Sequence, residues 1–551
     1  MTNNNNLSPF KRLINLLTLE RRDIFQVFYY AIFSGFMSLT LPLGIQAIIN
    51  LIQGAQISTS WIILVILVTI GVVFNGALQL MQLRIIETIQ QRIFARSSFD
   101  LTYRFPKMKM KELRNSYAPE LANRFFDTLT VQKGLSKILI DVPTSLLQII
   151  FALILLSFYH PFFIIFGVVL VALFILVFQY SAQKGLETSL LESKHKYKVA
   201  HWIQEVARSL VSFKLSGTTH LALDKNDKLV DQYIKAREGH FGIIRIQFIK
   251  MIAFKVLITA GLLIVGGLLV LNQQMNIGQF VAAEIIILLV ISSVEKLIYS
   301  LETIYDTLTS IEKLGQIVDK ELEPQSGETL ESENKMFIKL EKVSYKAPGQ
   351  EVNTLNKINI DFPAGSKTLI RGENGSGKST LLKVITGIIN PNYGGVYINN
   401  LPLKSLNINS YRSSIGESLS EEMPFEGTLK ENLTFGNPNI NDREIFRILE
   451  IVNLTSFLKK LDQGLQTIIY PEGKQIPTTI SKKIILARAL LKNPKILILE
   501  NAFFEFEITE ADLIIRNLNE HYSDLTFIIV SSSPIWDSYC DREITLTKES
   551  N

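Results

Sequence analysis

The chain has 551 residues, 47% of them hydrophobic and only 19% charged, and its net charge at neutral pH is +5. This composition is more apolar than that of a purely soluble protein, and so small a positive charge does not indicate a nucleic-acid partner. A single cysteine, Cys540, excludes an internal disulfide framework. The apolar residues gather in the first half of the chain, in stretches long enough to cross a bilayer, which indicates a multi-pass membrane protein.

Six apolar stretches in this half each approach or exceed the roughly 17–25 residues that a helix needs to span the hydrocarbon core. The first contains Pro42, which predicts a kink. We expect membrane helices over Ile24–Ile52, Trp61–Met81, Val142–Phe158, Pro161–Tyr180, Met251–Leu271 and Phe280–Ser300.

The segments between these stretches alternate between uncharged turns and long basic loops. Gln53–Ser60 and Asn272–Gln279 carry no Lys, Arg, Asp or Glu, whereas basic residues gather before the first stretch and after the second. By the positive-inside rule, both termini and the long loops are cytoplasmic. The long loops, at about 82–140 and 181–248, are amphipathic and are expected to extend the helices into the cytosol. The Asn/Ile/Lys-rich composition points to a bacterial inner (plasma) membrane.

Six charged side chains lie within or beside the expected spans. Charges in membrane segments are costly and often mark functional cavities, so these six could line a substrate path. Alternatively, long side chains near helix ends extend their charged groups to the water interface, and we favour this interpretation. The six residues are Asp141, Lys250, Lys255, Glu284, Glu295 and Lys296.

An acidic segment broken by Pro324 and Gly327 follows the last span. This mixture of charge, proline and glycine is typical of a linker, which we place at residues 319–336. A membrane domain is therefore expected over residues 1–318 and a second domain over 337–551. In the second domain, strand-like and helix-like stretches alternate, which predicts an α/β fold.

The stretch Arg371–Thr380 fits the pattern G-x-x-x-x-G-K-[ST] and lies between a strand-like run and a helix-like run. Its glycines allow backbone N–H groups to turn toward a phosphate, while Lys378 brings a charge to the β/γ oxygens. The Ser379 hydroxyl is placed to ligate Mg²⁺. We expect the nucleotide to be bound by Gly372, Asn374, Gly375, Ser376, Gly377, Lys378, Ser379 and Thr380.

Six spans with long cytoplasmic loops, followed by a P-loop domain, resemble an ATP-binding cassette (ABC) exporter half-transporter over about residues 20–548. Shorter runs resemble other family sequences. Gly427–Leu433 resembles a G-T-[IL]-x-E-N-[IL] run, Leu486–Pro494 and Ile496–Leu499 resemble the helix before the second nucleotide motif and the strand that carries that motif, and Arg104–Asp127 is similar to the first intracellular loop. The resemblance implies a six-span α-helical transmembrane domain followed by an α/β P-loop nucleotide-binding domain, with ATP and Mg²⁺ as cofactors. It implies that Tyr345 stacks on adenine, and that the chain pairs in a lipid membrane as a homodimer or as a heterodimer with a second half-transporter.

Two parts of the expected nucleotide site depart from the family pattern. Glu500 and Asn501 stand where the family has Asp-Glu, so Glu500 could still ligate Mg²⁺, but Asn501 has no anionic oxygen to act as general base. The family's signature motif falls on Ile476–Ile480, where Pro477 lacks an N–H and threonines replace glycines. Either threonine of this run is expected to cap the helix that follows.

Three further family positions are also changed. The family's loop glutamine falls on Ser420, its switch histidine on Ser532 and its D-loop aspartate on Glu507. Together with the missing base, these changes predict a degenerate domain that binds Mg-ATP, hydrolyses it poorly and has no catalytic residue of its own. The alternative is that hydrolysis survives by rearrangement of the site.

The expected function is that of an exporter subunit that couples ATP binding to movement of a substrate. Two alternatives are a membrane ATP sensor or regulatory subunit that does not transport, and an ATP-gated channel. Hydrolysis coupled to transport would distinguish the first function, and ion conductance would identify the channel. The sequence does not indicate the substrate, and lipids, peptides, proteins and drugs all fit.

Overall fold

The computed structural model describes residues 7–54, 59–114, 116–179, 182–330 and 335–547. The chain divides into two compact units. The first comprises Met1–Met108 and Leu113–Glu321, and the second comprises Lys109–Glu112 and Leu322–Asn551. Tyr180, the expected end of the fourth span, and residues 331–334 of the expected linker lie outside the described residues.

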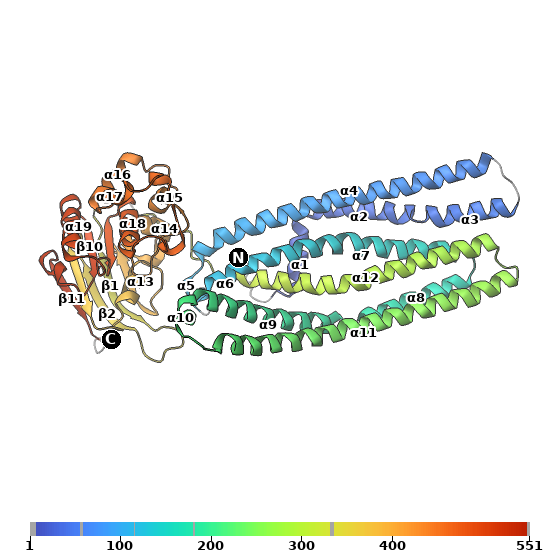
Figure 1. Ribbon diagram of the computed structural model, residues 1–551, viewed down its shortest axis with the longest axis horizontal. Coiled ribbons are helices and arrows are strands. Elements are labelled where there is room, and N and C mark those ends of the chain that lie inside the picture. Colours follow the sequence, from blue (N-terminus) through green and yellow to red (C-terminus); the bar gives the residue numbers. More distant parts are fainter. Residues whose placement is uncertain (1–6, 55–58, 115, 180–181, 331–334, 548–551) are drawn as a thin grey trace. The chain divides into compact units, whose positions relative to one another are not determined.

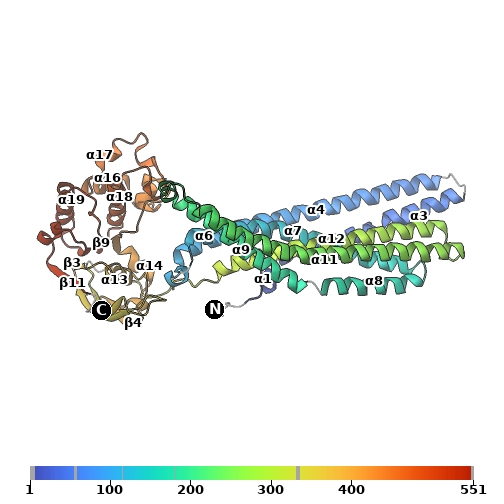
Figure 2. The same cartoon turned by 60° about the horizontal axis from the view of Figure 1, so that its bottom comes forward.

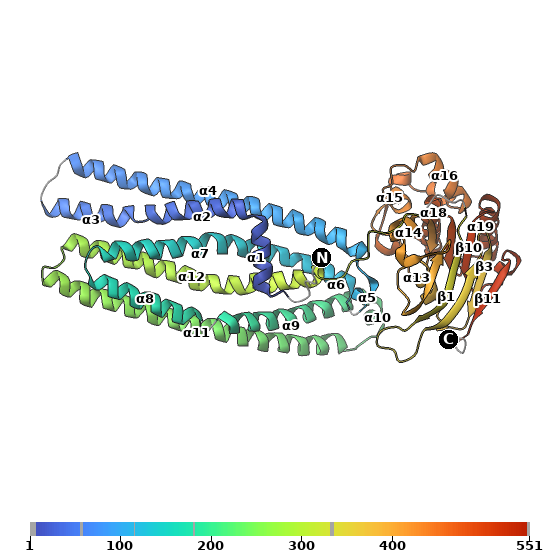
Figure 3. The same ribbon diagram turned by 180° about the vertical axis from the view of Figure 1, so that it is seen from behind.

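The first unit is a bundle of long helices that run alongside one another (Figure 1; Figure 2). Figure 3 shows α1 lying across this bundle rather than along it. The main helices are α1 (Pro9–Leu19), α2 (Arg21–Met37), α3 (Thr40–Gln53), α4 (Thr59–Arg104), α7 (Asp127–Ser157), α8 (Phe162–Gln179), α9 (Ala182–Arg208), α11 (Leu221–Leu271) and α12 (Ile277–Val318). The short helices α6 (Ala118–Asn123) and α10 (Leu210–Leu215) lie in the connections, and α5 (Met110–Leu113), which follows α4 in the chain, belongs mostly to the second unit.

In the described part of the chain, five helical segments are long and apolar enough to cross a membrane. A shorter apolar helical stretch, Phe162–Ala172, begins α8 at the place of the fourth expected span. The five longer segments are Arg21–Gln53, Thr59–Lys107, Ala118–Ser157, Leu221–Leu271 and Ile277–Val318.

The first expected span is broken near the proline that predicts its kink. Helix α2 ends at Met37 and α3 begins at Thr40, so Pro42 lies in the first turn of α3. Proline is tolerated there because the N–H groups of a first helical turn have no partner within the helix. The other long helices extend far beyond a bilayer: α11 has 51 residues and is about 77 Å long.

The second unit contains a parallel sheet in the order β11-β3-β10-β9-β6 and an antiparallel sheet in the order β2-β1-β4-β5. The parallel strands are β3 (Lys367–Gly372), β6 (Ile415–Ser418), β9 (Ile496–Glu500), β10 (Thr526–Val530) and β11 (Arg542–Leu546). The antiparallel strands are β1 (Ile338–Tyr345), β2 (Leu355–Phe362), β4 (Tyr393–Ile398) and β5 (Leu401–Pro402). A further pair of two-residue strands, β7 (Gly427–Thr428) and β8 (Ile468–Ile469), is antiparallel.

The parallel sheet is packed on both faces. One face meets α13 (Lys378–Ile385) and the antiparallel sheet in one hydrophobic cluster, and the other meets α16 (Asp442–Ile451), α18 (Thr478–Leu491) and α19 (Ile508–His521) in a second cluster. Every residue of β9 and β10 is buried, which explains why these strands are nearly continuous apolar runs. The expected helical membrane domain followed by an α/β P-loop domain is confirmed.

Candidate nucleotide-binding site

Four loops that carry expected site residues leave one edge of the parallel sheet. The P-loop follows β3, Ser420 follows β6, Glu500 and Asn501 lie at the end of β9, and Ser532 follows β10. These strands are all parallel to their neighbours in the sheet, so their carboxyl ends meet at the same edge. In open α/β sheets, ligands bind outside this edge.

The P-loop has a backbone that its glycines alone allow. Gly375 and Gly377 have φ angles of 82° and 91°, in the left-handed region. A Cβ atom at Gly377 would lie 2.7 Å from the carbonyl oxygen of Thr354, and one at Gly372 would lie 2.3 Å from that of Leu546. The loop therefore has no room for side chains at these points, which leaves its backbone free to follow an anion closely.

Lys378 begins α13 and lies over the loop. Its ammonium group donates hydrogen bonds to the carbonyl oxygens of Gly372, at 2.7 Å, and Glu373, at 2.8 Å. An ammonium group has three donors, so these two bonds fix the position of the charge and leave a donor for a phosphate oxygen. The first N–H groups of α13 add the positive end of the helix dipole.

The other P-loop residues differ in how accessible they are. Asn374, Gly375 and Ser379 are exposed, as residues that reach a ligand must be, and Thr380 is half-buried in the first turn of α13. Ser376 is fully buried within the loop. The loop therefore presents backbone groups and the Ser379 hydroxyl on its outer surface.

Glu500 is buried and held by the loop after β6, with 5% of its surface exposed. One oxygen of its carboxylate accepts two hydrogen bonds from Ser420, one from the backbone N–H at 3.1 Å and one from the hydroxyl at 2.9 Å. Lys482 of α18 donates in turn to the carbonyl oxygen of Ser420, at 2.8 Å. In the sequence, Ser420 stands out only because it occupies the position of the family's loop glutamine. No local pattern predicts its contacts with Glu500 and Lys482.

The residues expected to hold Mg²⁺ are Ser379, in the first turn of α13, and Glu500, the last residue of β9. Within the described residues there is no cluster of three or more His, Cys, Asp or Glu side chains that could hold a metal ion. A single carboxylate and a hydroxyl suit Mg²⁺ bound together with nucleotide, because Mg²⁺ keeps several waters and takes other ligands from phosphates.

Asn501 stands where the general base is expected, and its side chain carries no charge. It is exposed, its φ angle is 48°, and its N–H donates to the carbonyl oxygen of Val530 at 2.8 Å. Asparagine tolerates this left-handed conformation better than most residues. An amide cannot accept a proton from water as a carboxylate does, so this position supplies no base.

The signature-like run begins α18. Pro477 is the N-cap residue, with no side-chain hydrogen bond to the helix. Thr478 and Thr479 are the first two helical residues, so the expectation that one of them caps the helix is wrong. Pro477 takes the N-cap position because its fixed φ, here −56°, suits the turn into a helix. The threonine side chains occupy space that glycines would leave open to a phosphate.

Tyr345 ends β1, in the antiparallel sheet rather than the parallel one. Its ring is partly buried against the core of that sheet, and its carbonyl oxygen accepts a hydrogen bond from the Thr354 N–H at 2.8 Å. The carbonyl oxygen of Thr354 in turn lies close to Gly377, in the space that a Cβ atom there would need. Tyr345 is thus connected to the P-loop through the turn between β1 and β2.

The last two substituted positions lie after β10 and at the start of α19. Ser532 is exposed in the loop after β10. Glu507 is the N-cap residue of α19 and makes no side-chain capping bond.

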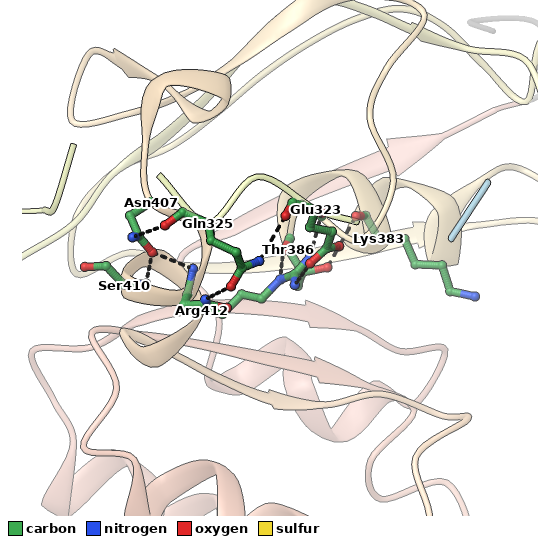
Figure 4. Close-up of polar contacts among 9 residues, drawn as sticks. Glu323, Gln325, Lys383, Thr386, Asn407, Ser410 and Arg412 are labelled. Carbon is green, nitrogen blue, oxygen red and sulfur yellow. Dashed lines mark hydrogen bonds and ion pairs between the residues drawn. The ribbon is translucent and has the colours of Figure 1, made fainter. Parts of the chain in front are cut away.

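The far end of α13 is tied to the start of the linker (Figure 4). Arg412, on α14 (Ile408–Ser413), donates to the carbonyl oxygens of Thr386, at 3.2 Å, and Gly387, at 2.8 Å. The same guanidinium forms a bidentate ion pair with Glu323, at 2.6 and 2.9 Å. The amide group of Asn407 donates to the Gln325 carbonyl oxygen, at 3.1 Å. We call this set of contacts the linker clasp.

One carboxyl group beside Ser420 has a shifted proton affinity. Burial raises the pKa of Glu422 to about 7, and the nearby Glu417 carboxylate acts in the same direction. The Glu422 carboxylate accepts a hydrogen bond from the Leu419 N–H, at 3.1 Å, so the group supports the loop that positions Ser420.

Comparison with known proteins identifies both units. Residues 24–294 match the family described as the ABC transporter transmembrane region, and residues 355–503 match the family described as ABC transporter. The second match contains the P-loop, Ser420, Glu500 and Asn501.

Individual relatives match parts of the chain. The alpha-hemolysin translocation ATP-binding protein HlyB of Escherichia coli O157:H7 is 26% identical over 48% of this chain and 37% of its own length. The toxin RTX-I translocation ATP-binding protein of Actinobacillus pleuropneumoniae is 24% identical over 63% of this chain and 49% of its own length. The matched regions thus span less than half the length of these relatives.

Among solved structures, that of a bacterial Atm1-family ABC exporter with ATP bound is similar over 96% of this chain and 93% of its own, with a TM-score of 0.85 and 14% identity. At this identity, the likeness concerns the fold. A transmembrane region and a nucleotide-binding domain, in this order and with this fold, are the architecture of an exporter half-transporter. The chain belongs to the ABC transporter family.

Proposed function

We propose that the chain is one half of a dimeric ABC exporter that binds Mg-ATP at its P-loop and couples this binding to movement of a substrate across the membrane. Membership of the family supports ATP binding, and the fold shared with an ABC exporter supports export. The observation that carries the proposal is the glycine-lined P-loop, with the Lys378 ammonium fixed over it.

Each residue of the site has a role that follows from its chemistry. The N–H groups of the P-loop and of the first turn of α13 hold the phosphates, and Lys378 neutralises charge on the β and γ oxygens. Ser379 and Glu500 hold Mg²⁺, which when bound offsets the charge of the phosphates. Tyr345 provides a flat surface for adenine.

We further propose that hydrolysis at this site is impaired. Asn501 cannot take a proton from the attacking water. At the start of α18, Pro477 has no N–H group to offer a γ-phosphate, and the threonine side chains after it occupy space that the phosphate would need. In this family each ATP lies between the P-loop of one chain and the signature of the other. A homodimer would therefore lack the general base and the signature at both sites. With a partner chain that has both motifs, only the site formed by the partner's P-loop and base would hydrolyse ATP, and it would still meet the altered signature of this chain.

The same chain could act without transporting, as a membrane ATP sensor or regulatory subunit, or as an ATP-gated channel. ATP-dependent movement of a solute distinguishes an exporter from both, and ion conductance identifies a channel. The basic loops support an orientation with both termini in the cytoplasm, and the Asn/Ile/Lys-rich composition supports a bacterial inner membrane.

Binding of Mg-ATP to the full chain in lipid nanodiscs tests the proposal. Lys378→Ala is expected to lower ATP affinity at least a hundredfold, because it removes the charge that meets the β and γ oxygens. Lys383→Ala is the matched control, since Lys383 lies on the same helix but pairs with Glu421, at 2.9 Å. Unchanged affinity in Lys378→Ala would overturn the assignment of the site.

A further inference from the structure

The helical unit contains a cavity of about 450 Å³ between α4, α7 and α12. Several polar side chains lie on its wall beside apolar ones. Among the lining residues are Gln79, Gln82, Asp141, Thr144, Ser145 and Lys296. The volume lies within the roughly 300–1,000 Å³ range of small-molecule sites and is far too small for a folded protein.

Three buried oxygen atoms on this wall have no hydrogen-bond partner within the described residues. They are the Gln82 side-chain carbonyl oxygen and the hydroxyl oxygens of Thr144 and Ser145. Gln82 is fully buried and Ser145 is 1% exposed. The amide N–H₂ group of Gln82 donates to the Val27 carbonyl oxygen at 3.2 Å, which fixes the amide. The three atoms are buried within the wall, and the polar side chains that a solute in the cavity can reach include those of Gln79, Asp141 and Lys296, which are exposed or half-buried.

The cavity wall also carries one charge of each sign. Asp141 comes from α7 and Lys296 from α12. No ion pair within 4.0 Å involves either group in the described part of the chain, and the Asp141 carboxylate lies in the electrostatic field of Lys296 and Lys137. By contrast, Lys255 and Glu295 form an ion pair with each other. Pairing accounts for the latter two charges. Asp141 and Lys296 attract each other without direct contact, and two opposite charges held apart beside a cavity have the character of a binding site.

We propose that this cavity binds a small zwitterionic solute. The Asp141 carboxylate holds the ammonium group of the solute, and the Lys296 ammonium group holds its anionic group. The inference rests on the proposed export function, because it names the class of substrate that the transporter carries.

Binding of tritiated alanine, dialanine and trialanine to the full chain in nanodiscs tests this proposal. The three probes are zwitterions of increasing charge separation, so the tightest one reports the spacing of the two protein charges. The N-acetylated and C-amidated forms of that peptide each remove one charge. We expect each blocked form to bind about tenfold or more weakly than the zwitterion.

Matched variants connect each charge to its partner. Asp141→Asn is expected to weaken binding of the zwitterion about tenfold or more and to leave binding of the N-acetylated form unchanged. Lys296→Gln should weaken binding of the zwitterion to a similar degree and leave binding of the C-amidated form unchanged. Glu284→Gln, which removes a carboxylate of α12 that does not line the cavity, should change neither. The proposal would be overturned if no probe bound at millimolar concentration. It would also be overturned if a peptide that is both N-acetylated and C-amidated bound as tightly as the zwitterion. A loss in Asp141→Asn that is the same for all probes would overturn it as well.

Lys378→Ala separates this proposal from the proposed function. The variant should lose ATP binding and keep zwitterion binding. Selective zwitterion binding in a chain whose wild-type form does not bind ATP would overturn the proposed function alone. ATP binding without zwitterion selectivity would overturn the inference about the cavity alone.

Discussion

Ser420 and Glu500 form a pair that replaces the glutamine and aspartate of the family pattern. The glutamate is one methylene longer than an aspartate, and the serine is shorter than a glutamine. Two hydrogen bonds to one carboxylate oxygen leave the other oxygen of Glu500 for a metal ion. The longer glutamate thus extends toward the shorter serine, and the two side chains remain in hydrogen-bond contact. In the sequence alone, each substitution looks like the loss of a family residue.

Ser420→Ala tests this pairing. The change removes the hydroxyl donor that orients Glu500 and leaves the backbone donor in place. Groups that orient metal ligands typically contribute about ten- to hundredfold to metal affinity, and we expect a loss near tenfold in the Mg²⁺ dependence of ATP binding. Ser413→Ala, at an exposed serine of α14, serves as the control. An unchanged Mg²⁺ dependence in Ser420→Ala would show that the hydroxyl bond to Glu500 has no part in metal binding.

The pKa of Glu422 predicts how pH acts on the loop that holds Ser420. Its carboxyl group binds a proton more tightly in the folded protein, with a pKa of about 7, than in the unfolded chain, where carboxyl groups titrate near 4.5. Between these pH values the folded state holds more protons, so stability falls as pH rises and the contribution is lost above pH 7. Glu422→Gln should therefore reduce the decrease in melting temperature between pH 6 and pH 8. An equal decrease in both proteins would contradict the prediction.

At the scale of elements, the linker clasp joins the first residues after the helical unit to the end of α13, the helix that carries Lys378 (Figure 4). Arg412 joins the two segments. It pairs with the Glu323 carboxylate on one side and donates to the carbonyl oxygens of Thr386 and Gly387 on the other. Its planar guanidinium suits this role, because it can bind a carboxylate with two donors and still reach carbonyl oxygens.

Arg412→Ala should destabilise the nucleotide-binding domain by about 2 kcal/mol, between the values for exposed and buried ion pairs. Glu323→Gln should cost less, because the bonds to Thr386 and Gly387 remain. The melting temperature of each variant is the measurement, with exposed Arg443→Ala on α16 as the control. If Arg412→Ala melted at the temperature of wild type, the clasp would have no part in stability.

The sequence predicts elements where one local rule determines them. The P-loop pattern, the apolar stretches and the break near Pro42 each follow from a few neighbouring residues. The capping expectation for Thr478 and Thr479 is wrong because Pro477 competes for the same position, and local rules do not rank the two. The linker clasp and the polar cavity join residues far apart in the chain, so no single-sequence pattern reveals them.

At the scale of the whole molecule, the substituted residues belong to several segments that are far apart in the chain: the ends of β6, β9 and β10 and the starts of α18 and α19. Because the base position and the signature-like run are both changed, restoring one should not restore hydrolysis. Asn501→Glu alone is therefore expected to leave ATP turnover of the purified protein within about threefold of wild type, far below the 10²–10⁴-fold that a general base typically contributes. A gain of a hundredfold or more would show that the missing base is the only defect.

The most direct measurement is Mg-ATP turnover by the purified full chain in lipid nanodiscs, with ATP binding followed on the same sample and Lys378→Ala as the blank. The account predicts saturable binding that Lys378→Ala abolishes, together with turnover far below about 1 s⁻¹, the low end of ordinary enzymes. Turnover at or above about 1 s⁻¹ would contradict it, and the protein would then be a self-sufficient ATPase.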